Sequence, residues 1–344
     1  MNKSQWRIAI VAGLLLTAIS VTFYTYQLFY TANLQLGKED KAIFIAEKTT
    51  FPQLLELLKK EQIIHEVVSF AFVAKVLSYQ EHVKAGRYII KKNMSNLAAV
   101  RMLRAGLQAP VELTFNNVRL MSDFTERVAE EVAFKKDELD KLLKDQNFVK
   151  KYGFDTTNIM AMFLPNTYQI YWNIKPEAFV ERMHKEYKKF WNDERLKQAK
   201  NLNLTPIEVS VLASIVQAET QKQDEKPRVA GVYLNRLRKK IRLEADPTLV
   251  FAAKDFTIKR VLDVHKKIDS PYNTYKYAGL PPGTINMPTE NTLKATLNAE
   301  KHDYIFFCAK EDFSGYHNFA VNYSDHLKNA RIYQRALDVK GIKK

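Results

Sequence analysis

The chain of 344 residues has little cysteine and little glycine: Cys308 is its single thiol, and there are only ten glycines. One cysteine cannot form an internal disulfide, so the fold must be held together by its core alone. The seven histidines show no H-E-x-x-H or comparable spacing, and no glycine-rich phosphate-binding loop is present. We therefore expect no metal site and no cofactor. An apolar content of 46% without repeats or low-complexity tracts excludes a disordered or fibrous chain.

Acidic residues are also fewer than basic ones: the chain has 38 Asp and Glu but 53 Lys and Arg, which gives a net charge of +15. Such a surface attracts nucleic acid, anionic lipid headgroups or an acidic polymer. A basic nucleic-acid-binding protein is one alternative that this charge leaves open. The sequence has no helix-turn-helix signature, RNP motif or zinc-finger spacing, so we expect no nucleic-acid partner.

Residues 8–30 contain no charged side chain, and none follows until Lys38. This run is long enough to cross a bilayer, which takes about 20 apolar residues. Lys3 and Arg7 precede it, so the positive-inside rule places the N-terminus in the cytoplasm and the rest of the chain outside. A cleavable signal peptide would have a shorter apolar region and a small-residue cleavage site. We therefore predict an uncleaved single-pass anchor in the inner (cytoplasmic) membrane.

Hydrophobic periodicity predicts an α+β fold with an N-terminal transmembrane helix. After the stub and anchor at 1–38 we expect a small α+β module at 39–116 and a larger, mainly helical domain with short strands at 117–344. The larger domain would comprise a helical connector at 117–200 and a core at 201–344. The expected strands cover 42–46, 86–90, 111–115 and 304–309, and the expected helices include 67–77, 97–103 (closed by Gly106), 205–220, 227–240, 289–297 and helices beginning near 51 and 246.

The helix predicted to start at 205–208 carries an acid on its apolar face. Thr205 reads as N-cap, Pro206 as the first helical residue and Glu208 as the partner in a capping box. Glu219 shares one helical stripe with Val209, Leu212, Ile215 and Val216.

A carboxyl group in that stripe loses solvation, which raises its pKa and lets it hold a proton near neutral pH. A proton donor in an apolar cleft is what glycosidic bond cleavage needs. The open alternative is a structural role, in which Glu219 turns to solvent or pairs with a nearby cation, Lys222, Lys226 or Arg228.

Four further segments accompany this helix: 235–237 (NRL), 243–248 (LEADPT), 270–285 (SPYNTYKYAGLPPGTI) and 315–319 (GYHNF). Asp246 before Pro247 is expected to be a helix N-cap. Proline, glycine and tyrosine make 270–285 a stiff loop of the kind that carries binding groups. Tyrosine faces can stack on sugar rings while Asn and Thr supply hydrogen bonds.

Together these segments resemble the endolytic murein transglycosylase family, also called YceG-like. Its pattern A-S-I-V-x-x-E-T, N-R-L, L-x-x-D-P-T, S-P-Y-N-T-Y, G-L-P-P-G-x-I and H-x-F is matched in order at 213–220, 235–237, 243–248, 270–275, 279–285 and 317–319. Gly86-Arg87-Tyr88 and the helix after it resemble the family's LysM-like region, and 164–168 resembles its P-x-T-Y element. One departure is Glu244, where the family often has Gln.

The resemblance implies a lytic transglycosylase that cleaves the β-1,4 bond between N-acetylmuramic acid and N-acetylglucosamine of peptidoglycan without water. Glu219 would be the catalytic acid and then base, and the product would carry a 1,6-anhydro ring. The residues implied in substrate binding are Glu244, Asp246, Thr248, Tyr272, Asn273, Thr274, Tyr275, Gly279, Leu280, Pro281, Pro282 and His317.

The implied partners are peptidoglycan glycan strands, the inner membrane, and peptidoglycan synthases (penicillin-binding proteins). No metal or other cofactor is implied. Glu244 could bind substrate, tune Glu219 or simply be tolerated. The alternative function is a catalytically silent, membrane-anchored glycan-binding or scaffold protein of cell-wall synthesis.

Overall fold

The computed structural model describes residues 2–340, which form a mixed α+β structure that is mostly helical with short strands. This confirms the predicted fold class at that level. The described chain divides into two compact units. Unit 1 takes residues up to 113 together with 131–133 and 168–174, and unit 2 takes 114–130, 134–167 and the rest from 175.

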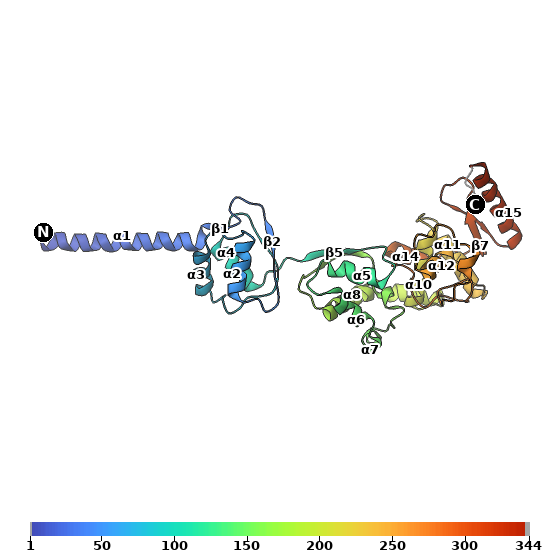
Figure 1. Cartoon of the computed structure of the whole chain (residues 1–344), viewed down its shortest axis with the longest axis horizontal. Helices are drawn as coiled ribbons and strands as arrows, with labels where there is room; N and C mark the ends of the chain where they lie inside the picture. Colours follow the sequence, from blue (N-terminus) through green and yellow to red (C-terminus); the bar gives the residue numbers. More distant parts are fainter. Residues whose placement is uncertain (1, 341–344) are drawn as a thin grey trace. The chain divides into compact units, whose positions relative to one another are not determined.

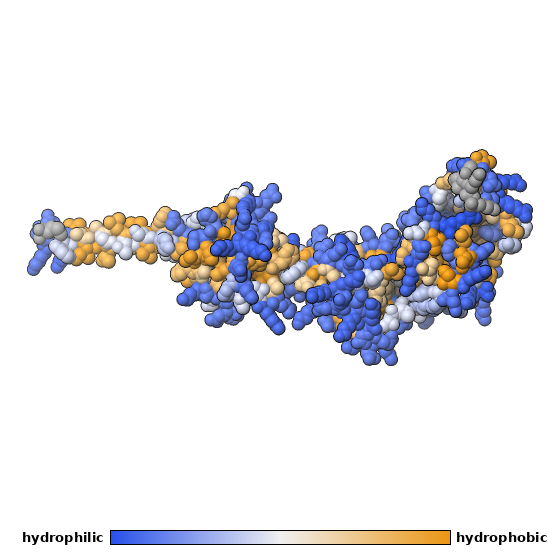
Figure 2. Space-filling view, in the orientation of Figure 1, coloured by the Kyte–Doolittle hydropathy of each residue, from blue (hydrophilic) through white to orange (hydrophobic). Residues whose placement is uncertain are grey.

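The first helix, α1 (Lys3–Tyr30), is one uninterrupted apolar rod (Figure 1). Asn2 caps its N-terminus and forms a capping box with Gln5, so the helix begins before the uncharged run does. None of its residues is buried, and apolar side chains lie along its surface (Figure 2). By length and composition it can cross a membrane.

Unit 1 is built on short antiparallel pairs: β1 (Ala32–Leu34) with β4 (Met94–Ser95), and β2 (Lys41–Ile45) with β3 (Gly86–Ile90). Two helices, α2 (Phe51–Lys60) and α3 (Val67–Val76), lie in sequence between β2 and β3. A third, α4 (Asn96–Ala105), ends at Gly106, whose φ of 75° suits a residue without a side chain. All five predicted elements of this region are present, within one or two residues of their expected bounds.

The core of unit 1 is formed by one face of the β2–β3 pair and by the helices. Ile43 lies opposite Tyr88 in the β2–β3 register, and both are buried. They pack with the apolar faces of the helices, which include Leu54, Phe70 and Leu103. Burial of these side chains is the main stabilising contribution to the unit, because it contains no disulfide.

The first part of unit 2 is a helical region around an aromatic cluster. Phe124, Phe163 and Phe179 pack together, with ring centroids of Phe124 and Phe163 4.3 Å apart. Its helices are α5 (Met121–Ala129), α6 (Lys136–Leu143), α7 (Gln146–Lys150), the 3₁₀-helix η1 (Ile159–Met162), α8 (Pro176–Phe190) and α9 (Asp193–Asn201), and the same stretch of chain contains the strands β5 (Val111–Phe115) and β6 (Asn166–Ile170). The strands β5 and β6 pair in a sheet of their own, and the division between the units passes through both.

The second part of unit 2 is centred on α10 (Pro206–Glu219), which packs against α11 (Lys226–Arg238), α12 (Asp246–Ala253) and α14 (Glu290–Leu297) (Figure 1). A single-turn helix, α13 (Asp263–Lys266), follows α12. Thr205 and Glu208 form the predicted capping box. The prediction of Asp246 as an N-cap is wrong: Ala245 is the N-cap and Asp246 is the first helical residue, because its carboxylate accepts a hydrogen bond from Tyr275 instead.

The last described elements are a hairpin and a helix. β7 (Phe306–Ala309) pairs antiparallel with β8 (His317–Ala320), and α15 (Tyr323–Val339) packs on both strands. The ring of His326 on α15 stacks on Phe306 at 5.1 Å. The strand starts two residues later than the sequence predicts.

Gly231, in the middle of α11, provides a test of this packing. A Cβ at this position would overlap the carbonyl oxygen of Glu300. We expect Gly231→Ala to lower the free energy of unfolding by about 1–3 kcal/mol, as overpacking typically does, measured by thermal or denaturant unfolding. Gly13→Ala is the control, because no atom lies within 4 Å of that position; equal stability of the two variants would contradict the close approach.

Candidate active site

A cleft of about 1080 Å³ opens in unit 2 at the C-terminal end of α10. Its lining residues come from the segments 116–119, 217–226, 246–261, 285–289 and 333–337. Of the residues predicted for the site, Glu219 and Asp246 line this cleft. The wall formed by α15 was not predicted from the sequence.

Glu219 is held by a tyrosine on the neighbouring helix. The hydroxyl of Tyr233 donates a hydrogen bond to Oε1 of Glu219 at 2.6 Å. Tyr233 is almost completely buried, while the Glu219 side chain keeps partial access to solvent. The other carboxyl oxygen, Oε2, is therefore the one left for proton exchange with a bound molecule.

The surroundings of Glu219 favour its neutral form. Burial raises the pKa of this carboxyl from 4.5 to about 7. That pKa of about 7 already includes two smaller effects: the hydrogen bond from Tyr233 lowers it by stabilising the carboxylate, and the negative charge of Asp246 raises it. The predicted desolvation of Glu219 is confirmed, and the group can give up or accept a proton near neutral pH.

The alternative that Glu219 pairs with a nearby cation is wrong for the described residues. The ammonium group of Lys226 donates to Thr292 Oγ1 at 2.7 Å, and Arg228 pairs with Glu300 at 2.9 Å. Lys222 lies over the ring of Tyr316, 4.7 Å from its centroid. Each of these three cations has its own contact, and the hydrogen bond found at Glu219 is the one from Tyr233.

Asp246 faces the same cleft from the first turn of α12. Its Oδ1 accepts a hydrogen bond of 2.6 Å from the Tyr275 hydroxyl. Burial, and then Asp246, raise the pKa of Tyr275, so this phenol stays protonated. The pair brings two predicted site residues together across 29 positions of sequence.

Beneath this pair lies a small buried cluster of hydroxyl groups. The Oγ1 atoms of Thr248 and Thr274 are 2.8 Å apart, and Thr274 Oγ1 accepts from the amide of Ala245 at 3.0 Å. Both threonines are buried, with their hydroxyl groups engaged in the protein. They fix the start of α12 against the 270–275 loop, and with it the direction of Asp246.

Glu244, the departure from the family pattern, forms an ion pair with Arg236. The two groups are 2.7 Å apart, and the Arg236 side chain is only 9% exposed. The same guanidinium donates to the Leu243 carbonyl at 2.9 Å. A glutamate here therefore neutralises a cation that is mostly removed from water, which glutamine could not do.

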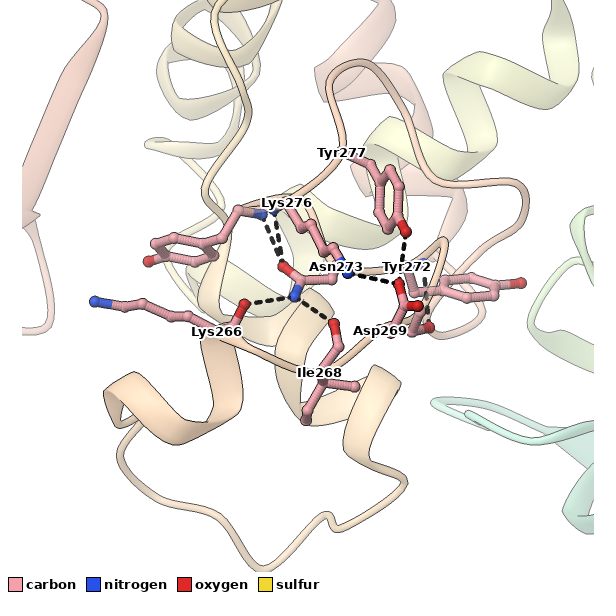
Figure 3. A network of polar contacts seen from close by, with 9 residues as sticks. Lys266, Ile268, Asp269, Tyr272, Asn273, Lys276 and Tyr277 are labelled. Carbon is pink, nitrogen blue, oxygen red and sulfur yellow. Dashed lines mark hydrogen bonds and ion pairs between the residues drawn. The ribbon is translucent and has the colours of Figure 1, made fainter.

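Asn273 organises the loop between α13 and the 279–285 segment (Figure 3). Its Nδ2 donates to the carbonyls of Lys266 at 2.9 Å and Ile268 at 2.8 Å. Its Oδ1 accepts from the amides of Tyr275 and Lys276. Asn273 is fully buried, so all of its hydrogen-bonding capacity is used inside the loop.

The remaining loop residues are mainly packed. Tyr272 lies 4.7 Å from the ring of Phe251, and Leu280 packs against the core of this region. Pro281 is buried and Pro282 is exposed. Gly279 has a φ of 89°, which a residue with a side chain rarely adopts.

Within the described residues, the hydrogen bonds of His317 are with Glu225 and not with Glu219. Its Nδ1 and its backbone amide both contact the carboxylate of Glu225, at 2.7 and 2.8 Å. Glu225 is buried and also accepts from the Thr220 hydroxyl at 3.0 Å. The three residues connect the chain immediately after Glu219 to β8, so His317 positions the C-terminal end of α10.

Sequence reasoning missed the polar residues that attach α10 to its surroundings. Gln217 donates to Asn286 Oδ1 and to the Met287 carbonyl, and its Oε1 accepts from Thr289. Tyr233 was also missed. The available signal was its position four residues after Val229 on the buried face of α11, where a phenol needs a partner.

A half-buried acid with a raised pKa in the wall of a cleft, on an α+β scaffold, defines a protein suited to acid–base chemistry. The chain belongs to the YceG-like family, whose model matches residues 43–332.

Curated relatives named endolytic murein transglycosylase include one from Bacillus subtilis (strain 168). It is 26% identical, with 85% of this chain and 84% of that protein covered. A Streptococcus pneumoniae relative of the same name (serotype 2, strain D39 / NCTC 7466) is 24% identical, and the match covers 89% of this chain and 61% of that longer protein. A crystal structure of a YceG-like protein from Listeria monocytogenes has a TM-score of 0.56 at 24% identity, covering 84% of this chain and 98% of that one. That likeness shows a shared fold.

The raised pKa of Glu219 predicts a pH-dependent stability. The folded-state pKa of about 7 exceeds the ordinary 4.5, so the folded protein binds this proton more tightly than the unfolded chain does. The resulting contribution to the free energy of unfolding is fully present below about pH 4.5 and is lost as the pH rises to about 7. Above pH 7 the native state contains an unfavourable buried carboxylate. Glu219→Gln removes that cost, so the variant should melt at a higher temperature than the unaltered protein at pH 8, with a much smaller difference at pH 5.

Thermal unfolding at the two pH values measures this difference, and Glu56→Gln at an exposed position is the control. A change in melting temperature that is the same at pH 5 and pH 8 would show that Glu219 is not destabilised by ionisation.

Proposed function

We propose that this chain is a membrane-anchored endolytic lytic transglycosylase that cleaves the β-1,4 bond between N-acetylmuramic acid and N-acetylglucosamine in peptidoglycan. The observation that carries the proposal is Glu219, a cleft-facing carboxyl group whose pKa is raised to about 7 by burial. The name of the curated relatives supports the substrate. The enzyme would trim or terminate nascent glycan strands.

In the proposed mechanism one carboxyl group performs both proton transfers. Protonated Glu219 gives its proton to the glycosidic oxygen as the bond from C1 of the muramic acid breaks. The carboxylate then takes the proton of the C6 hydroxyl of the same sugar while O6 bonds to C1 and closes the 1,6-anhydro ring. No water is consumed, so a second carboxylate to activate a nucleophile, as in ordinary glycosidases, is unnecessary.

Tyr233 and Asp246 adjust the acid in this scheme. The Tyr233 hydroxyl stabilises the carboxylate that forms after the first proton transfer, while Asp246 favours the protonated starting state. The hydrogen bond to Oε1 also orients the carboxyl group, and a fixed orientation matters because proton transfer needs the donor within hydrogen-bonding reach. Thr248, Tyr272, Asn273, Thr274, Tyr275 and His317 contribute by holding the walls of the cleft in place.

The anchor and the module that follows fit this role. With α1 crossing the cytoplasmic membrane and Lys3 and Arg7 inside, the later residues would face newly made glycan on the outer side, where peptidoglycan synthases work. The order β2, α2, α3, β3, with two helices between paired strands, supports a LysM-like, glycan-gripping role for residues 39–116. Residues 117–344 would be the catalytic domain.

Replacement of the acid tests the proposal directly. General acid catalysis contributes about 10²–10⁴-fold, so Glu219→Gln should reduce peptidoglycan cleavage at least about 100-fold. The assay is digestion of purified peptidoglycan by the full chain in detergent, followed by mass spectrometry of the new ends. Anhydro-muramic ends are expected. Reducing ends would indicate a hydrolase, and no cleavage by the unaltered protein would favour the silent scaffold.

Tyr233→Phe tests the pKa assignment. Activity of the unaltered protein should fall about tenfold per pH unit above about pH 7, as the acid loses its proton. Loss of the Tyr233 hydrogen bond destabilises the carboxylate, so the alkaline limb of the kcat/KM profile should move to higher pH. An unmoved limb would mean that another group controls it. Tyr187→Phe, at a buried tyrosine outside the cleft, is the control.

A further inference from the structure

Three basic side chains line the same cleft as Glu219: Arg119, Lys259 and Arg260. All three are exposed. Within the described residues none of them forms an ion pair, whereas Arg228, Arg236 and Lys276 in the same part of unit 2 each pair with a carboxylate. They are a local excess of positive charge on a cleft whose own acids are Glu219 and Asp246.

The position of Arg119 is fixed by aromatic contacts. Its guanidinium lies over the ring of Phe256, 4.7 Å from the centroid, and Phe256 in turn contacts Phe251. Phe256 belongs to the segment 254–262 that also carries Lys259 and Arg260. The contact therefore holds the β5–α5 connection against the segment that carries the other two cations.

Lys226 is a fourth cation of the cleft wall, and it behaves differently. Its side chain is almost entirely enclosed, at 3% exposed, and its ammonium group donates to Thr292 Oγ1. Burial lowers its pKa. Because this group already has an acceptor inside the protein, the three exposed cations are the ones available to an anion.

We propose that Arg119, Lys259 and Arg260 bind carboxylates that muramic acid carries on its 3-O-lactyl substituent, and so select glycan bearing such groups; this rests on the function proposed above. The N-acetylated sugar backbone is uncharged, so every carboxylate of a strand belongs to the lactyl group or to the peptide attached to it. Guanidinium groups match carboxylates through paired hydrogen bonds. Without these cations, the negative charge of Asp246 would repel an anionic strand from the cleft.

The carboxylate has two possible sources, the lactyl group itself on peptide-free strands and the peptide stem on intact strands. The chemistry is the same in both cases. Binding of Glu219→Gln protein, full length in detergent, to three glycans distinguishes them: strands with peptide stems, amidase-treated strands, and strands whose carboxylates have been converted to amides. The first two should bind more tightly than the third, and the tighter of the two identifies the source.

The variant Arg119→Gln/Lys259→Gln/Arg260→Gln is the direct test. Exposed charge contacts each contribute a factor of about two to five, so KM should rise about tenfold or more while kcat changes little. The dependence of KM on salt should also weaken, because fewer charges are screened. Lys188→Gln/Lys189→Gln/Lys197→Gln is the matched control, with the same loss of charge at exposed positions outside the cleft. Lys259→Gln alone serves if the triple variant fails to fold.

The outcomes separate this inference from the proposed function. Cleavage with unchanged KM in the triple variant, together with equal binding of the amidated and carboxylate-bearing strands, would overturn the role of the three cations. Failure of the unaltered protein to cleave any peptidoglycan would instead overturn the enzymatic assignment, and binding by the Glu219→Gln protein would still decide whether the cations recognise carboxylates.

Discussion

The hydrogen bond between Tyr233 and Glu219 is the contact on which the rest of the site depends. It joins α10 to α11 at the place where the apolar stripe of α10 reaches the cleft. Burial alone would favour a permanently neutral acid, and full hydration would leave a permanently ionised one. The phenol provides a partner for either state, so the carboxyl group can change protonation without losing the hydrogen bond from Tyr233.

A supporting network of hydrogen bonds explains why so many residues of the family pattern are buried. The Asn273 side chain forms hydrogen bonds with backbone groups, and the hydroxyl groups of Thr248 and Thr274 bond to each other. Polar residues of this kind are costly to bury unless every group is satisfied, and once satisfied they specify a single loop conformation. In this site the polar motif residues Asn273, Thr248 and Thr274 act as framework, and the charged groups that line the cleft are Glu219, Asp246 and the basic residues Arg119, Lys226, Lys259 and Arg260.

Sequence patterns predicted local structure well because the signals are local. Thr205, Pro206 and Glu208 lie within one turn, and Gly106 needs only its own φ to end α4. The desolvation of Glu219 could be predicted for the same reason, since its stripe lies on one helix. Pairings across the chain could not be predicted: His317 meets Glu225 over 92 positions, and Tyr233 reaches Glu219 only because two helices cross at a particular angle. Asp246 shows the limit most clearly, because a tertiary hydrogen bond from Tyr275 overrides its local capping preference. Its role in contacting glycan, like that of the other motif residues, stays a prediction.

The contribution of α15 to the cleft has a consequence for the synthesis of the protein. Tyr333, Gln334 and Leu337 form part of the wall, although the acid lies more than a hundred residues earlier in the chain. A growing polypeptide can complete α10 and α11 well before this wall exists. An unfinished chain therefore contains its acid before the cleft has all of its wall, which is completed when residues 323–339 pack on the β7–β8 hairpin.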